Sequence, residues 1–355
     1  MSRKEPQRQE DTKLHKGFFM AQKEPQRHES TRIYEGFFAL FAKNFALFAV
    51  KKYYIFLLLI IISSCKDTNK YLDDSPVSGT IHISVDESFK PVIEEQIKMY
   101  EASWPQANII AHYKPEASCL KDFFNDTLTR MVIITRGLTD KEEKYFLDSL
   151  KYTPPWNIIA SDAIAIIVNA NSQDTLFSLT RLQQQLKGQI KREQTIVFDG
   201  LNATSTVRYI TDSILNGGKF DTSVVKAAKN SKEVLEYVST HENAIGMIGV
   251  SWIGNPEDSN HINWLKKVKI GYVECSTCAD STFVKPMQES ILTKRYPLVR
   301  GLHYAVKENY TGLGTGFINF MKHERGQLIF KRAYLGPVMG FGIRKVKINE
   351  TLPKN

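Results

Sequence analysis

The sequence predicts an α/β protein with two domains. At 355 residues the chain is too long for one compact sandwich or helix bundle, since a single domain commonly holds about 150 residues. From Gly79 onward, short β-branched runs alternate with segments of helical periodicity, which is typical of parallel strands joined by helices. The composition, with 42% hydrophobic and 24% charged residues, excludes a disordered chain and a protein with many membrane spans.

The first part of this alternation ends near Leu150. Its strand-like runs are short and rich in Ile and Val, and its helical segments place apolar residues three or four positions apart. Strands joined by helices pair in parallel, so we expect a parallel sheet. In chain order the expected elements are a strand over 80–85, a helix over 89–100, a strand over 108–112, a helix through 120–124, a strand over 131–134 and a helix over 139–150.

The second part follows Pro154-Pro155. The run over 158–169 is long, apolar and interrupted only by Ser161-Asp162, so we expect a strand that crosses from one domain to the other. A second α/β unit and a shorter tail follow it. The unit runs through 180–186, 195–198, 204–215, 232–238 and 244–250; strand-like stretches cover 268–274 and 299–306, and closing helices cover 312–321 and 326–333.

A lipoprotein signal precedes the α/β region. Lys51-Lys52 stands before the apolar run 53–62, which is too short to span a bilayer. Ile62-Ser63-Ser64-Cys65 then resembles a lipobox, in which the Cys65 thiol is diacylated and anchors the protein in the membrane. We interpret 1–64 as leader and signal peptide and 65–78 as linker; the alternative is an ordinary buried cysteine after a core strand.

Half of the net charge of +9 belongs to the leader. Residues 1–64 hold eleven Lys/Arg against six Asp/Glu, and no basic run with interleaved aromatics follows, so we expect no nucleic-acid partner. The motif Lys-Glu-Pro-Gln-Arg occurs at 4–8 and again at 23–27, and two copies are too few for a solenoid. We expect translation to begin near Val50, with 1–49 an artefact or an extended leader.

Three cysteines remain after Cys65. Export favours disulfides, so we expect a loop disulfide between Cys275 and Cys278, while Cys119 is isolated. Half of a zinc site and a redox pair are the alternatives. A zinc site would need a second Cys/His pair at matching spacing, and a redox pair would need a helix directly after it. The sequence has neither, so we expect no metal and no cofactor.

Several segments, taken in order, resemble one family. They are Ile83-Ser84-Val85-Asp86-Glu87-Ser88-Phe89, Thr135-Arg136-Gly137-Leu138, 162–169, the loop Phe198-Asp199-Gly200 through Thr204-Ser205-Thr206-Val207-Arg208, 244–249, and Tyr296-Pro297-Leu298-Val299-Arg300. On these segments the chain resembles the periplasmic phosphate-binding proteins of ABC transporters from Ser78 to about Ile348.

The resemblance implies a type II periplasmic-binding-protein fold with two α/β lobes and a hinge of two segments. Lobe one would hold 79–160 and 285–348, and lobe two 161–284, with ligand closing the cleft between them. The function implied is that of a lipid-anchored protein at the periplasmic face, which captures inorganic phosphate and delivers it to the permease subunits of an ABC importer. We expect binding rather than catalysis.

Hydroxyl side chains at expected helix starts are the main candidate ligands for phosphate. Free N–H groups and partial positive charge favour an oxyanion there, and an arginine adds a bidentate pair. These residues have structural alternatives, because Ser and Thr are common helix caps and Arg136 has carboxylates such as Asp140 nearby. The candidates are Ser88, Thr135, Arg136, Asp199, Thr204, Ser205 and Thr206, with Asp162, Ser118 and Asn202 as weaker ones.

Two carboxylates are candidates to accept the hydrogen of HPO₄²⁻ and so to reject sulfate: Asp199 and Asp162. The family more often has arginine near Asp199, so this chain departs from its pattern there. Two other function classes remain open. One is the same scaffold binding molybdate or sulfate, or acting as a sensor. The other is an exported hydrolase, against which the sequence argues because it contains no His/Asp cluster, no Gly-x-Ser-x-Gly elbow and no Walker loop.

Overall fold

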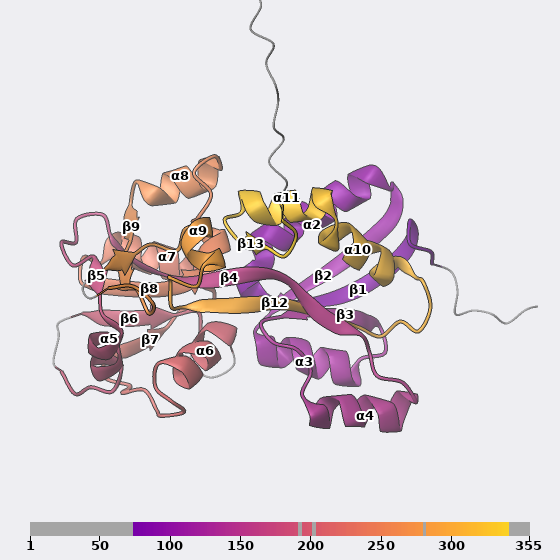
Figure 1. Cartoon of the computed structure of the whole chain (residues 1–355), viewed down its shortest axis with the longest axis horizontal. Helices are drawn as coiled ribbons and strands as arrows, with labels where there is room; N and C mark the ends of the chain where they lie inside the picture. The colour runs from indigo at the N-terminus through magenta and orange to yellow at the C-terminus, as the bar shows by residue number, and fades with distance from the viewer. Residues whose placement is uncertain (1–73, 191–193, 201–203, 280–281, 341–355) are drawn as a thin grey trace, which may run out of the picture. The chain divides into compact units, whose positions relative to one another are not determined.

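The computed structural model describes residues 74–190, 194–200, 204–279 and 282–340 (Figure 1). The leader, the lipobox with Cys65, and Asn202 lie outside these described residues. Among the described helices, none is long and apolar enough to cross a membrane. The same residues contain no group of three or more His, Cys, Asp or Glu side chains arranged to hold a metal ion.

The strands of lobe one form a mixed sheet. In it β1 (Ser78–Asp86) pairs in parallel with both β2 (Gln106–Lys114) and β3 (Thr129–Ile134), as helix-linked strands should. The returning strand β12 (Val299–Val306) pairs with β3 in antiparallel orientation. Three helices connect these strands: α2 (Lys90–Ser103), α3 (Glu116–Asn125) and α4 (Asp140–Leu150).

The long strand β4 (Trp156–Asn169) joins the strands of both lobes into one continuous sheet, and Figure 1 shows it beside β12. Residues 156–163 pair with β12, and residues 164–168 pair with β8 (Ala244–Gly249) of lobe two. The second half of β4 is completely buried, because both faces of the sheet are covered there. A crossing strand was therefore predicted correctly, although the lobe bounds at 161 and 285 stay a prediction.

Lobe two has a parallel core of short strands. β6 (Thr195–Phe198) pairs in parallel with β8 and β7 (Val225–Ala227), and β9 (Val268–Ile270) pairs with the end of β4. The remaining elements of the described chain belong to both lobes. In chain order they are η1 (Glu87–Phe89), β5 (Leu176–Phe177), α5 (Leu179–Leu186), α6 (Ser205–Ser213), α7 (Ser231–Thr240), η2 (Val250–Trp252), α8 (Ser259–Leu265), β10 (Tyr272–Glu274), β11 (Phe283–Val284), α9 (Gln288–Leu292), α10 (Leu313–Lys322), α11 (Glu324–Arg332) and β13 (Gly336–Pro337).

Close packing of α7 on β8 depends on Gly246. A Cβ atom at this position would lie 2.8 Å from side-chain carbons of Ile167, Val234 and Val238, which is closer than van der Waals contact allows. The three aliphatic side chains are fully buried, and each contributes about 1.5–3 kcal/mol to folding by leaving water. Lobe two therefore has a tight core directly behind the strands that carry its polar loops.

The differences from the expected elements concern short segments, among them the unpredicted strands β5, β7, β11 and β13. The stretch 268–274 is divided at Gly271 into β9 and β10, which pair with different strands. The helices α8 and α9 were not predicted, because seven and five residues are too few to show a helical period.

The structure joins Cys275 to Cys278 in a disulfide after β10, and Cys119 is a buried free thiol.

Candidate anion-binding site

A buried polar cluster lies where the two lobes meet. It combines hydroxyl and carboxylate side chains with one guanidinium group, and all of its members are buried. They belong to η1 after β1, to the residue after β6, to the first turn of α6, and to the paired strands β4 and β12. The members are Ser88, Asp162, Asp199, Ser205, Thr206 and Arg300.

Helix capping explains how two of these loops are held. The Asp86 carboxylate caps η1 by accepting the Ser88 N–H at 2.9 Å, so Ser88 itself is not the cap and its hydroxyl is available to the cluster. Thr204 caps α6, because its hydroxyl accepts the Val207 N–H at 3.3 Å. Thr204 is therefore a helix cap, as the structural alternative predicted, while Ser205 and Thr206 lie in the first turn of the helix.

Hydroxyl groups from opposite lobes approach one another in the cluster. The Ser88 hydroxyl of lobe one lies 3.4 Å from the Ser205 hydroxyl of lobe two. It also donates to Asp199 Oδ2 at 3.5 Å, and Thr206 Oγ1 donates to the same oxygen at 3.2 Å. The structure thus brings together four of the main candidates, Ser88, Asp199, Ser205 and Thr206. The weaker candidate Asp162 joins them through Arg300.

Arg300 supplies the positive charge of the cluster. Its Nε donates to Asp162 Oδ2 at 2.8 Å, and its Nη1 donates to Ser205 Oγ at 2.9 Å and to Thr206 Oγ1 at 3.4 Å. The side chain is 1% exposed, and its Nη2 has no hydrogen-bond partner within the described part of the chain. Since a buried donor without a partner is costly, this nitrogen is a ready contact for an anionic ligand.

Buried carboxyl groups surround this cation. Burial raises the pKa of Asp86 to about 6, and the nearby Arg300 charge opposes that rise. Burial also raises the pKa values of Asp162 and Asp199. One oxygen of each of these three carboxyl groups, Asp86 Oδ2, Asp162 Oδ1 and Asp199 Oδ1, has no partner among the described residues. The cluster therefore offers unpaired acceptors as well as an unpaired donor.

Thr135 takes part in a different contact between the lobes. Its N–H and hydroxyl both donate to Glu116 Oε1, at 3.0 and 2.5 Å. Arg208 of α6 reaches across from lobe two and donates through Nε to Glu116 Oε2 at 2.6 Å and through Nη2 to the Thr135 hydroxyl at 2.6 Å. Thr135 thus orients Glu116 toward Arg208, and we name these three residues the interlobe clasp.

Arg136 lies outside the cluster as well. Its two terminal nitrogens form a bidentate pair with Glu142, at 2.7 and 2.8 Å, and Nη1 also donates to the Gly137 carbonyl. The carboxylate partner is therefore Glu142 rather than Asp140. Thr139 and Glu142 form the capping box of α4, which fixes Glu142 in reach of Arg136. Ser118 is a half-buried residue in the first turn of α3 and does not belong to the cluster.

A cavity of about 320 Å³ opens next to the cluster. Both lobes contribute to its wall, which combines acidic and basic side chains with two aromatic ones. Tyr113 Oη and Trp252 Nε1 in this wall are buried and have no hydrogen-bond partner among the residues that the structure describes. The lining consists of Asp86, Glu87, Lys90, Tyr113, Lys114, Pro115, Asp199, Thr204, Lys229, Asn230, Lys232 and Trp252.

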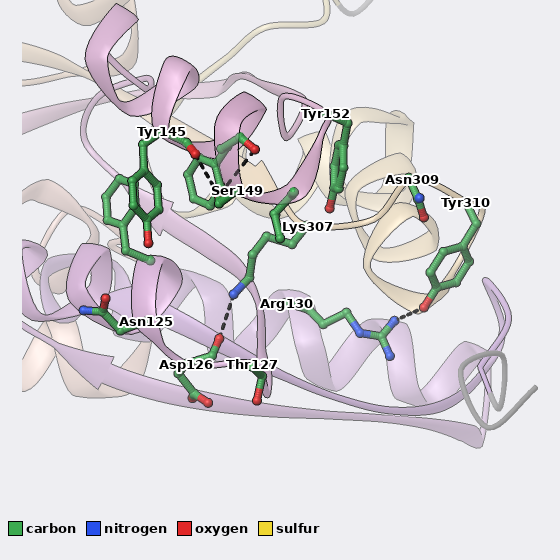
Figure 2. A pocket seen from close by; sticks show the side chains of 13 residues that line it. Asn125, Asp126, Thr127, Arg130, Tyr145, Ser149, Tyr152, Lys307, Asn309 and Tyr310 are labelled. Carbon is green, nitrogen blue, oxygen red and sulfur yellow. Dashed lines mark hydrogen bonds between the residues drawn. The ribbon is translucent and has the colours of Figure 1, made fainter.

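A second cavity, of about 690 Å³, lies on lobe one between α3 and α4 (Figure 2). Its walls are largely aromatic, and Figure 2 shows Lys307 donating to the Asp126 carbonyl, a bond of 2.7 Å. Arg130 donates to the Tyr310 hydroxyl at its edge. None of the predicted ligand residues lines this cavity, so it is separate from the site between the lobes.

The fold and the cluster agree with the family assignment. Residues 73–325 match the family model described as a PBP superfamily domain. The chain belongs to the PBP superfamily. No curated protein matches it.

Solved structures resemble this PBP chain in fold. One is described as a phosphate ABC transporter substrate-binding protein with bound phosphate from Clostridium perfringens, at 20% identity and a TM-score of 0.58, covering 74% of this chain and 100% of that one. An ABC-type phosphate transport receptor from Vibrio cholerae has 18% identity and a TM-score of 0.52, covering 73% and 100%. A protein from Planctomyces limnophilus DSM 3776, described as a phosphate binding protein, has 17% identity and a TM-score of 0.50, covering 74% and 94%.

Sequence reasoning did not assign a role to Arg300 in this PBP chain. The segment ending at Arg300 was recognised only as part of the resemblance. In the structure, β12 pairs with β4 so that Arg300 stands directly opposite Asp162, which brings the two side chains into contact. A signal was present, since a charged residue in each of two otherwise apolar strands suggests a buried pair.

Proposed function

We propose that this protein is a solute-binding component that captures an oxyanion, inorganic phosphate in the first place, between its two lobes. It would deliver the anion to the permease subunits of an ABC importer, without catalysing a reaction. Membership of the PBP superfamily supports this proposal, as does the fold shared with the phosphate-binding proteins named above.

One observation carries the proposal: donors from both lobes converge on one buried point. The Ser88 hydroxyl comes from lobe one, those of Ser205 and Thr206 come from lobe two, and Arg300 Nη1 already contacts the latter pair. Short hydrogen bonds from hydroxyls and a guanidinium are the interactions that a phosphate group prefers. A phosphate entering here would replace the contact between the Ser88 and Ser205 hydroxyls.

The acidic residues of the cluster give this site a preference among anions. A fully ionised sulfate has no hydrogen to donate, so it would leave Asp86 Oδ2 and Asp199 Oδ1 facing a second negative charge. Hydrogen phosphate can donate to one of these oxygens. We therefore propose phosphate over sulfate and molybdate.

We also propose that the protein acts at the periplasmic face of the envelope, anchored through lipid on Cys65. The lipobox sequence supports the anchor, because positive charge, a short apolar run and Ser63-Ser64 precede the cysteine. A role in sensing phosphate uses the same site and is compatible with this proposal.

Calorimetric titration of the purified full-length chain in mild detergent tests the function. We expect phosphate to bind with a Kd near 1 μM or below, equivalent to about −8 kcal/mol, and sulfate and molybdate to bind at least about 100-fold more weakly. Equal affinity for phosphate and sulfate would contradict the role given to the carboxyl groups. Absence of binding by all three anions would contradict the function itself.

A further inference from the structure

The cavity beside the cluster contains more acidic groups than a bare phosphate can satisfy. Asp86 and Asp199, one from each lobe, line it, and each has a carboxyl oxygen without a partner among the described residues. They are 1% and 4% exposed. A third carboxyl, that of Glu87, also lines the cavity but already accepts the Ser231 hydroxyl. Hydrogen phosphate has a single hydrogen to donate, so at least one unpaired acceptor would remain.

Among the described residues, the lysines of the same cavity form no ion pair with these carboxyl groups, and each lies within 3.8 Å of another acidic side chain. Two lysines of lobe one and two of lobe two stand in the wall, with side chains at least 42% exposed. The pairs are Lys90 with Glu94 at 3.8 Å, Lys114 with Asp122 at 2.6 Å, Lys229 with Glu233 at 3.7 Å and Lys232 with Glu236 at 3.7 Å.

The size of the cavity also exceeds the need of an inorganic anion. Its volume of about 320 Å³ falls in the range of sites for small organic molecules, roughly 300–1,000 Å³. Tyr113 and Trp252 add aromatic surface, and each has a buried polar atom without a described partner. Both features indicate that a ligand extends outward from the hydroxyl cluster into this space.

We propose that the ligand is a phosphate monoester that carries a primary ammonium group. Its phosphoryl group contacts the hydroxyls of Ser88, Ser205 and Thr206 and the Nη2 of Arg300. Its ammonium group lies in the cavity and donates to Asp86 and Asp199. A primary ammonium has three donors and one positive charge, which matches the unpaired carboxyl oxygens of Asp86 and Asp199. This inference rests on the proposed capture of a phosphate group and names the class of molecule that carries it.

Four ligands that differ in single groups test the inference by calorimetric titration of the full-length chain. They are O-phosphoethanolamine, ethyl phosphate without the amine, phosphocholine with the charge but without N–H donors, and inorganic phosphate. We expect O-phosphoethanolamine to bind at least about tenfold more tightly than each of the other three. If inorganic phosphate binds as tightly or more tightly, the inference is wrong and the proposed function stands. If none of the four binds, both are wrong.

Variants locate the amine. Asp199→Asn should reduce the advantage of O-phosphoethanolamine over ethyl phosphate to about threefold or less, because a neutral amide no longer attracts the ammonium charge. Glu289→Gln is the matched control, since this exposed carboxylate on α9 lies outside the cavity, and it should keep the full advantage. An advantage that survives in Asp199→Asn and also in Asp86→Asn overturns the placement. The comparison of ligands in the unmodified chain does not depend on the folding of either variant.

Discussion

Replacement of Arg208 by alanine should weaken phosphate binding by about 30-fold, although we do not place Arg208 against the ligand. Arg208 belongs to the interlobe clasp, in which it contacts Glu116 of the other lobe at 2.6 Å. The clasp can exist only while the lobes are together, so its loss destabilises the closed, ligand-bound state relative to the open one.

The expected magnitude follows from the burial of the two partners. Removing one partner of a buried ion pair costs about 3–5 kcal/mol, and an exposed pair contributes about 0–1 kcal/mol. The Glu116 side chain is 4% exposed and that of Arg208 is 36% exposed, so the pair is intermediate. We take about 2 kcal/mol, which corresponds to about 30-fold in Kd.

The assay is calorimetric titration with phosphate, and Arg136→Ala is its matched control. Arg136 forms a comparable bidentate pair with Glu142, but both residues belong to lobe one. We expect Arg136→Ala to lower the melting temperature and to leave the Kd unchanged within about twofold. Equal Kd values for Arg208→Ala and the unmodified protein would refute the clasp. A large loss of affinity in Arg136→Ala would instead restore the sequence-based ligand role of Arg136.

Three further predictions follow from the site and the anchor. Arg300→Lys should weaken phosphate binding by about tenfold or more, because one ammonium nitrogen cannot reproduce the separate contacts of Nε with Asp162, Nη1 with Ser205 and Nη2 with the anion; titration measures this, and an unchanged Kd would remove Arg300 from the site. Burial raises the pKa of Asp86 from 3.8 to about 6, so the folded state favours the neutral carboxyl. The free energy of unfolding should therefore fall by about 3 kcal/mol as the pH rises from below 4 through 6. Thermal melts should show a larger loss in the unmodified protein than in Asp86→Asn, in which Glu87, Asp162 and Asp199 still titrate; identical pH profiles would refute it. Cys65→Ser should move the protein from membranes to the soluble fraction on cell fractionation, whereas retention in membranes would count against a lipid anchor.

Local sequence patterns were sufficient to find four of the six residues of the buried cluster. Thr204-Ser205-Thr206 precedes a helical segment, and the structure uses Thr204 as its cap and the next two residues as members of the cluster. Ser88 and Asp199 follow strands whose apolar character is plain in the sequence. These residues could be predicted because the loop after a strand and the first turn of a helix are local features.

The remaining two residues, Asp162 and Arg300, are brought together by a contact between distant segments. Arg300 contacts Asp162 across 138 residues, and only the antiparallel register of β12 and β4 places them opposite each other. Arg136 was predicted as a ligand because Thr135-Arg136-Gly137-Leu138 resembles a segment of the phosphate-binding family and because arginine forms bidentate pairs with oxyanions. Thr139 and Glu142 have the spacing of that motif, so the pair with Glu142 could have been recognised from the sequence.

The contacts between the lobes also bear on affinity. Besides the clasp, the Glu87 carboxylate of lobe one accepts the Ser231 hydroxyl at 2.8 Å and the Ser231 N–H at 3.3 Å, at the start of α7 in lobe two. Burial raises the pKa of Glu87 to about 7, so this contact changes its protonation near neutral pH. Neither contact uses a residue of the buried cluster. Closure is therefore stabilised partly by the protein itself, and the ligand has to provide only the remaining difference in free energy between the open and closed states.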